Sequence, residues 1–301
     1  MRKISDTLAF PQLRHFYFFL FCFFATLPFL TTVTAVGVLS FKDENYSHIA
    51  IVPTISIYMI YLARKTVFRD CSFSLRVGGP FLCLGALLYF VVRGPALASP
   101  GSDRFSAGVF AVVVIWVGTF ILFYGTRAAN ASKFSLLFLL LMIPIPTHLL
   151  GRIILDLQYG SADVSHLFLR LAGIPVFRQD LTFSLPGINI RVSEACSGIH
   201  SSVALMMVGL LAGHFCLEST WRKIVLSLLT VPISIVKNAL RITVISGLGI
   251  YVDPGFFYGK LHRYSGYPFA LVALAMLGPI FIALRRSEAS SATKRQDQIP
   301  Y

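Results

Sequence analysis

The sequence has few charged residues, and acidic residues are the scarcest of them. Only 13% of its 301 residues are charged, and Asp and Glu together number 13. Soluble domains carry about 25% charged residues, so this chain falls outside that class. Hydrophobic residues instead make up 56% of the sequence, and the mean hydropathy is +0.75. The composition therefore predicts that lipid surrounds most of the chain.

Cysteine is also scarce, and its spacing excludes two common uses. The chain has five cysteines, none of which forms a Cys-x-x-Cys pair or has the spacing of a metal site. We therefore expect neither a metal ion nor another cofactor.

Apolar runs recur along the chain, and about 20 such residues suffice to cross the hydrocarbon core of a bilayer. The eight runs cover approximately residues 16–39, 46–62, 77–92, 105–125, 134–150, 199–216, 224–251 and 267–284. The first run is too long for the core of a signal peptide and lacks a convincing cleavage site, so it is interpreted as an uncleaved membrane helix. The predicted fold class is an all-α polytopic membrane protein with about eight transmembrane helices. One membrane domain would cover residues 1–286, and a polar, disordered tail would cover residues 287–301.

The net charge of +13 is distributed mainly to one side of the predicted membrane. If the N-terminus is cytoplasmic, 15 of the 26 Lys and Arg residues fall in cytoplasmic segments and nine fall in outer segments. The remaining two, Lys237 and Arg241, lie inside the seventh apolar run. The excess of positive charge therefore indicates topology, with both termini cytoplasmic, and we expect membrane lipid and not nucleic acid as a partner.

This topology separates one cysteine from the other four. Cys22, Cys71, Cys83 and Cys216 fall on the cytoplasmic side or in the inner half of a helix. Cys196 alone falls at the outer face, where no second cysteine is available for an intramolecular disulfide. An unpaired thiol in an oxidising compartment suggests a chemical role.

The long stretch between the fifth and sixth runs has a pattern of its own. Residues 152–173 mix Leu and Ile with polar residues, as in an amphipathic helix that lies at the membrane interface. Apolar and polar residues then alternate over 181–185 and 188–192, on either side of Pro186-Gly187, which predicts a β-hairpin. The topology places this insert on the extracytoplasmic side, and the hairpin leads directly to Glu194.

Three short motifs resemble those of the exosortase and archaeosortase family. They are Glu194-Ala195-Cys196-Ser197-Gly198-Ile199-His200-Ser201, then Asn238-Ala239-Leu240-Arg241-Ile242, then His262 followed by Gly266. Tyr46-Ser47-His48 and Pro144-Ile145-Pro146 are similar to the family as well, so the resemblance covers roughly residues 45–285. Two positions depart from the pattern: Ile49 replaces an expected Gly, and His200 replaces a more usual Arg or Asn.

The resemblance implies a membrane cysteine protease or transpeptidase with Cys196, Arg241 and His262 as its catalytic residues. Substrates would be exported proteins with a C-terminal sorting signal, comprising a short motif such as Pro-Glu-Pro, a membrane helix and a basic cluster. The enzyme would work in the inner membrane of a prokaryote, in connection with polysaccharide or surface-protein export. The neighbouring motif residues would support the site; they are Glu194, Ser197, Gly198, His200 and Asn238.

The residues themselves favour the same trio, although each has a second interpretation. An ionised Arg at the centre of a membrane helix costs roughly 2.5–3.5 kcal/mol, so Arg241 should face the protein interior, either at a functional site or as a structural partner of Glu194. Cys196 would lie at a helix start, where unpaired N–H groups favour a thiolate, but free cysteines are often only small buried hydrophobes. His200 lies four residues after Cys196 and would share a helix face with it, which makes it a rival of His262.

Two other classes of membrane protein remain open on the sequence alone. In a transporter or channel, polar residues of a broken seventh helix would mark a midplane substrate site; these are Pro232, Lys237, Asn238 and Arg241. That class predicts inverted repeats, which the sequence does not show, and leaves Cys196 unexplained. The other class is a membrane protein of polysaccharide assembly that forms no acyl-enzyme.

Overall fold

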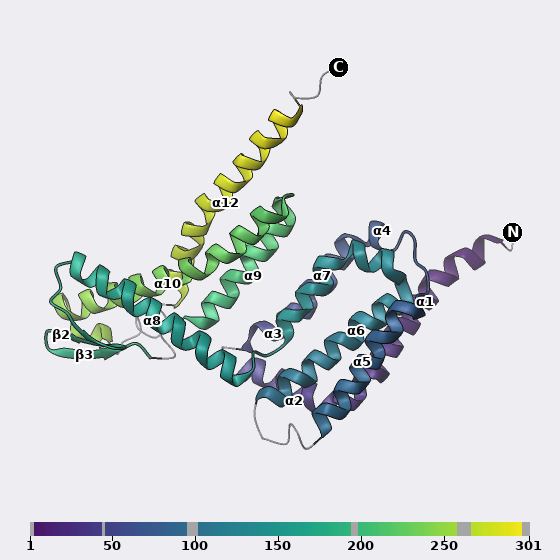
Figure 1. Ribbon diagram of the computed structural model, residues 1–301, viewed down its shortest axis with the longest axis horizontal. Coiled ribbons are helices and arrows are strands. Elements are labelled where there is room, and N and C mark those ends of the chain that lie inside the picture. The colour runs from purple at the N-terminus through teal and green to yellow at the C-terminus, as the bar shows by residue number, and fades with distance from the viewer. Residues whose placement is uncertain (1–2, 44–45, 95–101, 194–197, 258–265, 297–301) are drawn as a thin grey trace. The chain divides into compact units, whose positions relative to one another are not determined.

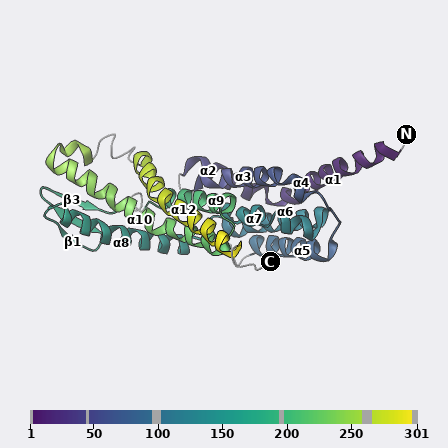
Figure 2. The ribbon, with the colours of Figure 1, turned by 90° about the horizontal axis from the view of Figure 1, so that it is seen from above.

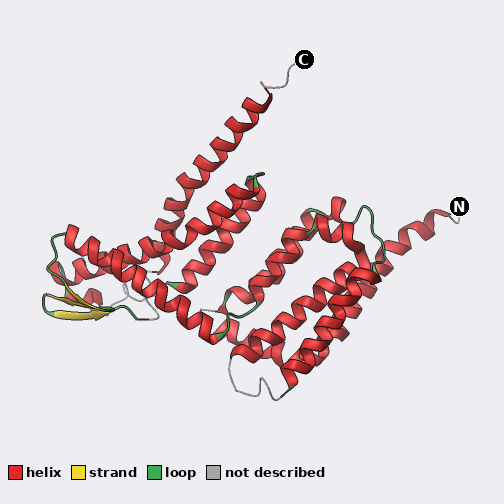
Figure 3. Cartoon of the chain, viewed as in Figure 1, coloured by secondary structure: helices red, strands yellow, loops and turns green. Residues whose placement is uncertain are grey.

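The computed structural model describes residues 3–43, 46–94, 102–193, 198–257 and 266–296. The chain is almost entirely helical, with a single small sheet (Figure 3). It divides into two compact units, Met1–Leu150 and Gly151–Tyr301. Each unit is described by itself.

The first unit is a group of apolar helices (Figure 1). They are α1 (Lys3–Thr26), α2 (Leu30–Lys42), α3 (His48–Leu62), α4 (Arg64–Val67), α5 (Leu75–Arg93), α6 (Ser102–Ala131) and α7 (Lys133–Phe138), with short 3-10 turns at Leu27–Phe29 and Leu139–Met142. Helices α5 and α6 lie side by side because glycines line their contact (Figures 1 and 2). A Cβ atom added at Gly78 would lie 2.7 Å from the backbone nitrogen of Leu122, so only glycine permits this approach.

The second unit combines four long helices with the sheet. Its elements are α8 (Thr147–Leu171, from Gly151 onward), β1 (Phe177–Gln179), β2 (Thr182–Leu185), β3 (Ile188–Arg191), α9 (Ile199–Cys216), α10 (Thr220–Tyr251), a 3-10 turn (Pro254–Phe257) and α12 (Gly266–Gln296). The three strands lie between α8 and α9 in the sequence, which is where the sequence predicts the hairpin.

Six described helical segments are long and apolar enough to cross a membrane, which confirms the prediction of a polytopic all-α membrane protein. They are Leu13–Lys42, Leu75–Arg93, Asp103–Ala131, Ile199–Cys216, Thr220–Tyr251 and Pro268–Ser290. A seventh span is obtained if Lys133–Met142 and Thr147–Leu171 count together, although they meet at a bend of 90°. The predicted number of eight is not confirmed.

Two of the predicted spans explain this difference. The run 134–150 is interrupted at Pro144 and Pro146, whose rings remove backbone N–H donors, so the chain turns there instead of continuing as one helix. The run 46–62 forms α3, whose 15 residues are fewer than the ~20 that a perpendicular span requires.

The sheet confirms the predicted hairpin and adds a strand to it. Strands β2 and β3 pair antiparallel, with Leu185 opposite Ile188 and Gly187 in the left-handed region at φ +80°. Strand β1 pairs with β2 on the other side, so the order is β1-β2-β3. This third strand was not predicted, because its three residues Phe177–Gln179 are too few to show alternation.

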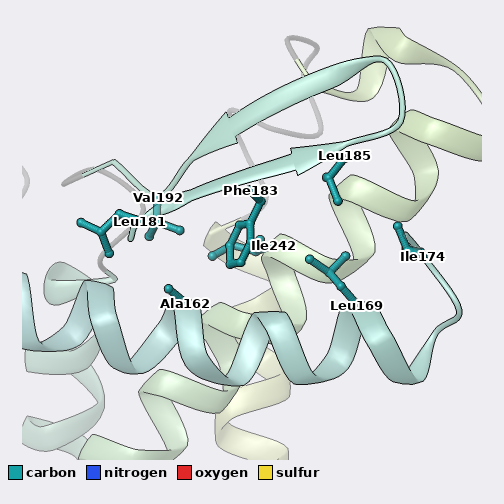
Figure 4. Close-up of a cluster of buried hydrophobic side chains, with 8 residues drawn as sticks. All are labelled: Ala162, Leu169, Ile174, Leu181, Phe183, Leu185, Val192 and Ile242. Carbon is teal, nitrogen blue, oxygen red and sulfur yellow. The ribbon is translucent and has the colours of Figure 1, made fainter. Parts of the chain in front are cut away.

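One face of the sheet packs against α8 and α10 (Figure 4). The buried cluster contains residues from the sheet, from the segments beside it and from both helices; its members are Ala162, Leu169, Ile174, Leu181, Phe183, Leu185, Val192 and Ile242. Phe183 of β2 is fully buried at its centre. The helix predicted over 152–173 is therefore present as α8, and apolar side chains of α8 pack against one face of the sheet.

Helix α12 extends beyond the membrane run into the polar tail. It continues to Gln296, so residues 287–296 are helical where the sequence suggests disorder. The carboxylate of Glu288 accepts hydrogen bonds from the backbone N–H groups of Glu218 and Ser219 and pairs with Arg222 at 3.2 Å. These contacts attach the extension to the N-terminal end of α10. The single membrane domain over residues 1–286 stays a prediction.

Candidate functional site

Some of the predicted site residues lie within the described part of the chain, and others lie outside it. Cys196, His262, Glu194 and Ser197 lie outside the described residues. Gly198, His200, Asn238 and Arg241 lie within them, all in the second unit. The geometry of the site is therefore built from the segments that lead into and out of residues 194–197.

The segment that leads into the motif is held by α8. The side-chain amide of Gln158 donates a hydrogen bond of 2.9 Å to the carbonyl oxygen of Val192, and both groups are buried. The backbone N–H of Val192 donates to the carbonyl of Leu181 at 2.9 Å, which closes the end of the hairpin. The chain is thus fixed two residues before Glu194.

The segment that leads out of the motif is a sharp turn into α9. Gly198 caps this helix in the left-handed region at φ +72°, a conformation that costs other residues roughly 1–2 kcal/mol. Its carbonyl oxygen accepts hydrogen bonds from the hydroxyl groups of Ser201 and Ser202, each at 2.9 Å, and from the backbone N–H of Ser202 at 2.8 Å. The first turn of α9 is therefore closed around Gly198.

Helix α10 lies directly against this turn. Lys237 is only 3% exposed, and its ammonium group donates a hydrogen bond to the hydroxyl of Ser201. A Cβ atom added at Gly198 would lie 3.5 Å from Lys237 Nζ and 3.6 Å from Asn238 Cγ. The turn that follows the cysteine motif therefore lies beside the stretch of α10 that carries the second motif, and the hydrogen bond between Lys237 and Ser201 joins the two helices.

Asn238 connects α10 to α8 as well. It is fully buried, and its side-chain amide donates a hydrogen bond of 3.0 Å to the hydroxyl of Ser161. The same α8 helix holds Val192 through Gln158. Helix α8 thus positions the entry to the cysteine motif and the polar centre of α10 together.

Arg241 lies one helical turn beyond Lys237 on α10 and is half-buried. Residues four apart on a helix occupy the same face, so the two cations lie on one side of α10, and Ile242 beside them packs under the sheet. Two cations on one face of an apolar helix create a positive potential in a region of low dielectric. Such a region can stabilise a thiolate or an oxyanion.

The described chain places His200 just after a sharp turn. The sequence argument puts Cys196 and His200 on one helix face, whereas α9 begins at Ile199, after the left-handed Gly198. Cys196 lies outside the described residues, so its relation to His200 stays a prediction. His200 itself lies in the first turn of α9 with an exposed side chain.

Four polar residues beside the cysteine motif were not predicted as catalytic or supporting residues of the enzyme, although the transporter alternative includes Lys237. They are Gln158 and Ser161 on α8, Ser201 on α9 and Lys237 on α10. A sequence signal existed on α8, where Gln158, Ser161 and Ser165 recur at helical spacing and are all buried. The amphipathic interpretation assigns polar residues to the solvent side, whereas here they line a protein contact. Among the described residues, no group of three potential metal ligands comes together.

The comparisons with known proteins give one match. A family model described as transmembrane exosortase (Exosortase_EpsH) matches residues 38–278. This range contains all three motifs and the described contacts of the site from Gln158 to Arg241. A search of curated proteins and a search of solved structures found no match.

Proposed function

Because the chain belongs to the transmembrane exosortase family, a role in processing sorting signals at a membrane follows, and we propose that it does so by acyl transfer through Cys196. The observation that carries this proposal is the hydrogen bond from Lys237 to Ser201, which holds the turn at Gly198 beside α10, one helical turn before Arg241. It supports a site in which the cysteine and arginine motifs act together.

Covalent geometry supports the role of Cys196. Two residues of chain span at most about 7 Å, so the Cα atom of Cys196 lies within that distance of Gly198. The N-terminal end of α9 carries the positive end of its helix dipole, and α10 contributes the charges of Lys237 and Arg241. These groups favour the thiolate, which is the nucleophilic form of cysteine.

The reaction follows from these roles. The Cys196 sulfur attacks a backbone carbonyl carbon of the substrate, and Arg241 stabilises the resulting oxyanion. The C–N bond then breaks, His262 donates a proton to the leaving amine, and a thioester to Cys196 remains. An acceptor nucleophile, or water, loses its proton to His262, attacks the thioester carbon and releases the thiolate.

The proposed substrate is an exported protein with a C-terminal sorting motif, a membrane helix and a basic cluster. Among the described residues, no strand pairs with the outer edge of β3, which leads within five residues to Cys196. An extended sorting motif would add to this edge as a further strand and reach the thiol. Deletion of the hairpin with full retention of processing would exclude this docking mode.

The proposed orientation places the site on the extracytoplasmic side, with both termini in the cytoplasm. It is supported by the excess of Lys and Arg in the predicted cytoplasmic segments. Sorting-signal processing after export requires that side, because the substrate motif has then crossed the membrane.

Substitution of the nucleophile tests the proposed function. Cells that express a reporter with a C-terminal sorting signal would carry the wild-type chain, Cys196→Ser or Cys83→Ser; Cys83 is exposed on α5 and serves as the matched control. We expect Cys196→Ser to leave the reporter at full length and Cys83→Ser to process it fully. Full processing by Cys196→Ser would favour a transporter or assembly protein without acyl-enzyme chemistry.

A further inference from the structure

The first unit contains a large apolar cavity that the proposed reaction does not use. Its volume is about 840 Å³, and its walls come from α1, α3, α4, α6, α7 and the 3-10 turn Leu139–Met142. All of these lie within Met1–Leu150, whereas the proposed catalytic residues belong to the other unit. A ligand bound in this cavity would therefore have a role separate from the proposed reaction.

The cavity opens to the surroundings through exposed apolar side chains. Phe19 and Phe23 of α1 and Ile57 of α3 line it, and they are 63%, 62% and 63% exposed. In a chain that spans a membrane, such side chains face lipid tails. The natural entrants are therefore apolar chains from the bilayer.

One end of the cavity is polar and positively charged. His15 Nδ1 and the Tyr124 hydroxyl are 2.6 Å apart there, and the Arg64 guanidinium lies 4.1 Å from the centre of the Tyr61 ring. Lys65 follows Arg64 directly in the sequence and does not line the cavity. At the opposite end, Trp116 donates a hydrogen bond to the Thr26 hydroxyl at 3.0 Å.

The dimensions decide between two classes of occupant. A membrane helix of 20 residues, ~30 Å long and ~10 Å wide, occupies roughly 2,400 Å³, about three times the cavity. The distance from His15 to Thr26 along α1 is only about 16 Å. The substrate's sorting helix is thus too large, whereas the volume lies in the range of small-ligand sites.

We propose that this cavity binds an anionic phospholipid. One acyl chain lies between α1, α3 and α6, and the phosphate group lies at Arg64. Basic groups at the edge of an apolar pocket between membrane helices recognise anionic head groups in this way. The positive-inside charge pattern assigns Arg64 to the cytoplasmic side, so the lipid belongs to the inner leaflet.

Fluorescence quenching by brominated lipids tests the proposal, because Trp116 lines the cavity and the chain has only one other tryptophan. The exposed Trp221 would be replaced by Phe, and the full-length variant reconstituted in phosphatidylcholine vesicles. Phosphatidylglycerol or phosphatidylcholine with dibrominated acyl chains would then be added in increasing mole fraction. We expect half-maximal quenching of Trp116 at about a fivefold lower fraction of phosphatidylglycerol, which corresponds to the ~1 kcal/mol that one surface cation contributes.

Two matched pairs of variants locate the site. Arg64→Gln should abolish the preference for phosphatidylglycerol, and Lys65→Gln should retain it, since both side chains are exposed but only Arg64 lines the cavity. Cys22→Phe should reduce the quenching by filling the cavity, and Cys83→Phe, on α5 outside it, should not. Equal quenching by both lipids, or a preference that survives both Arg64→Gln and Cys22→Phe, would overturn the proposal in favour of ordinary surrounding lipid.

Discussion

Lys237 is the residue whose burial is hardest to explain without function. The residue is 3% exposed within a membrane helix. Its ammonium group donates a hydrogen bond to the Ser201 hydroxyl, which in turn donates to the Gly198 carbonyl. A buried cation is retained in a membrane only where it has partners and a task. Here the chain of hydrogen bonds fixes the turn that follows Cys196, so we regard Lys237 as a positioning residue.

Replacing Lys237 should therefore impair processing without removing the nucleophile. Lys237→Met breaks the bond to Ser201, and a hydrogen bond to a charged group contributes about 1.5–3 kcal/mol. We expect processing of a sorting-signal reporter to fall by roughly tenfold or more. Iodoacetamide alkylation of Cys196, in a variant whose other four cysteines are replaced by Ser, should also slow at pH 7.

The control is Lys223→Met, on the first turn of the same helix and distant from Gly198 along it. It should process the reporter and react with iodoacetamide at wild-type rates. Unchanged alkylation in Lys237→Met would show that the buried cation has only a structural role.

Gly198 gives a second prediction at this scale, based on backbone conformation. A Cβ atom at this position would meet its neighbours at ordinary contact distances of 3.5–3.6 Å, so space is not limiting. The left-handed φ of +72° is limiting, and Gly198→Ala should destabilise the turn by roughly 1–2 kcal/mol. Processing should decrease in Gly198→Ala and recover in Gly198→Asn, because Asn tolerates this conformation better. Equal loss in both variants would mean that the side chain and not the backbone is the obstacle.

Among the elements, the sheet is the one that connects packing to the site. Phe183 is fully buried between the sheet and α8 (Figure 4). In contrast, Phe177 on β1 is 69% exposed. Phe183→Ala should lower the free energy of unfolding by about 3–5 kcal/mol, as for other large-to-small core changes. Phe177→Ala should change it far less. Thermal unfolding in detergent would measure both, and similar shifts for the two variants would contradict the packing described for the sheet.

The elements also show what local sequence can and cannot predict. The hairpin β2–β3 was predictable because alternation and Pro186-Gly187 are local signals, and α8 because its amphipathic period is long. The buried polar face formed by Gln158 and Ser161 was not, because only packing against α10 and the sheet end turns it inward. The apolar run 199–216 was predicted and coincides with α9, whereas the left-handed turn at Gly198 before it has no signal in the apolar pattern.

For the whole molecule, composition predicted membrane residence, and the family match agrees with the three motifs recognised in the sequence. The number of spans was less predictable, because hydropathy does not show where Pro144 and Pro146 turn the chain. The apolar cavity of the first unit was also not predictable from the sequence, because its walls come from helices far apart in the sequence. Motifs and composition can be recognised directly in a sequence, whereas packing between segments that are distant in the sequence cannot.

The proposed topology gives a prediction at this scale. In intact spheroplasts, a membrane-impermeant maleimide should label a variant that retains only Cys196 and should not label one that retains only Cys71, which the charge pattern places in the cytoplasm. After permeabilisation both should be labelled. Labelling of Cys71 alone in intact spheroplasts would reverse the orientation and place the site on the cytoplasmic side.

The central claim is that Cys196 forms a thioester with the substrate, and capturing that intermediate tests it most directly. The wild-type chain would be mixed with a sorting-signal substrate, quenched in acid and analysed by intact-mass spectrometry and peptide mapping. We predict an adduct on Cys196 that hydroxylamine releases, and that is absent from Cys196→Ala and present in Cys83→Ala. Cleavage of the substrate by Cys196→Ala, or an adduct on a different residue, would contradict the account.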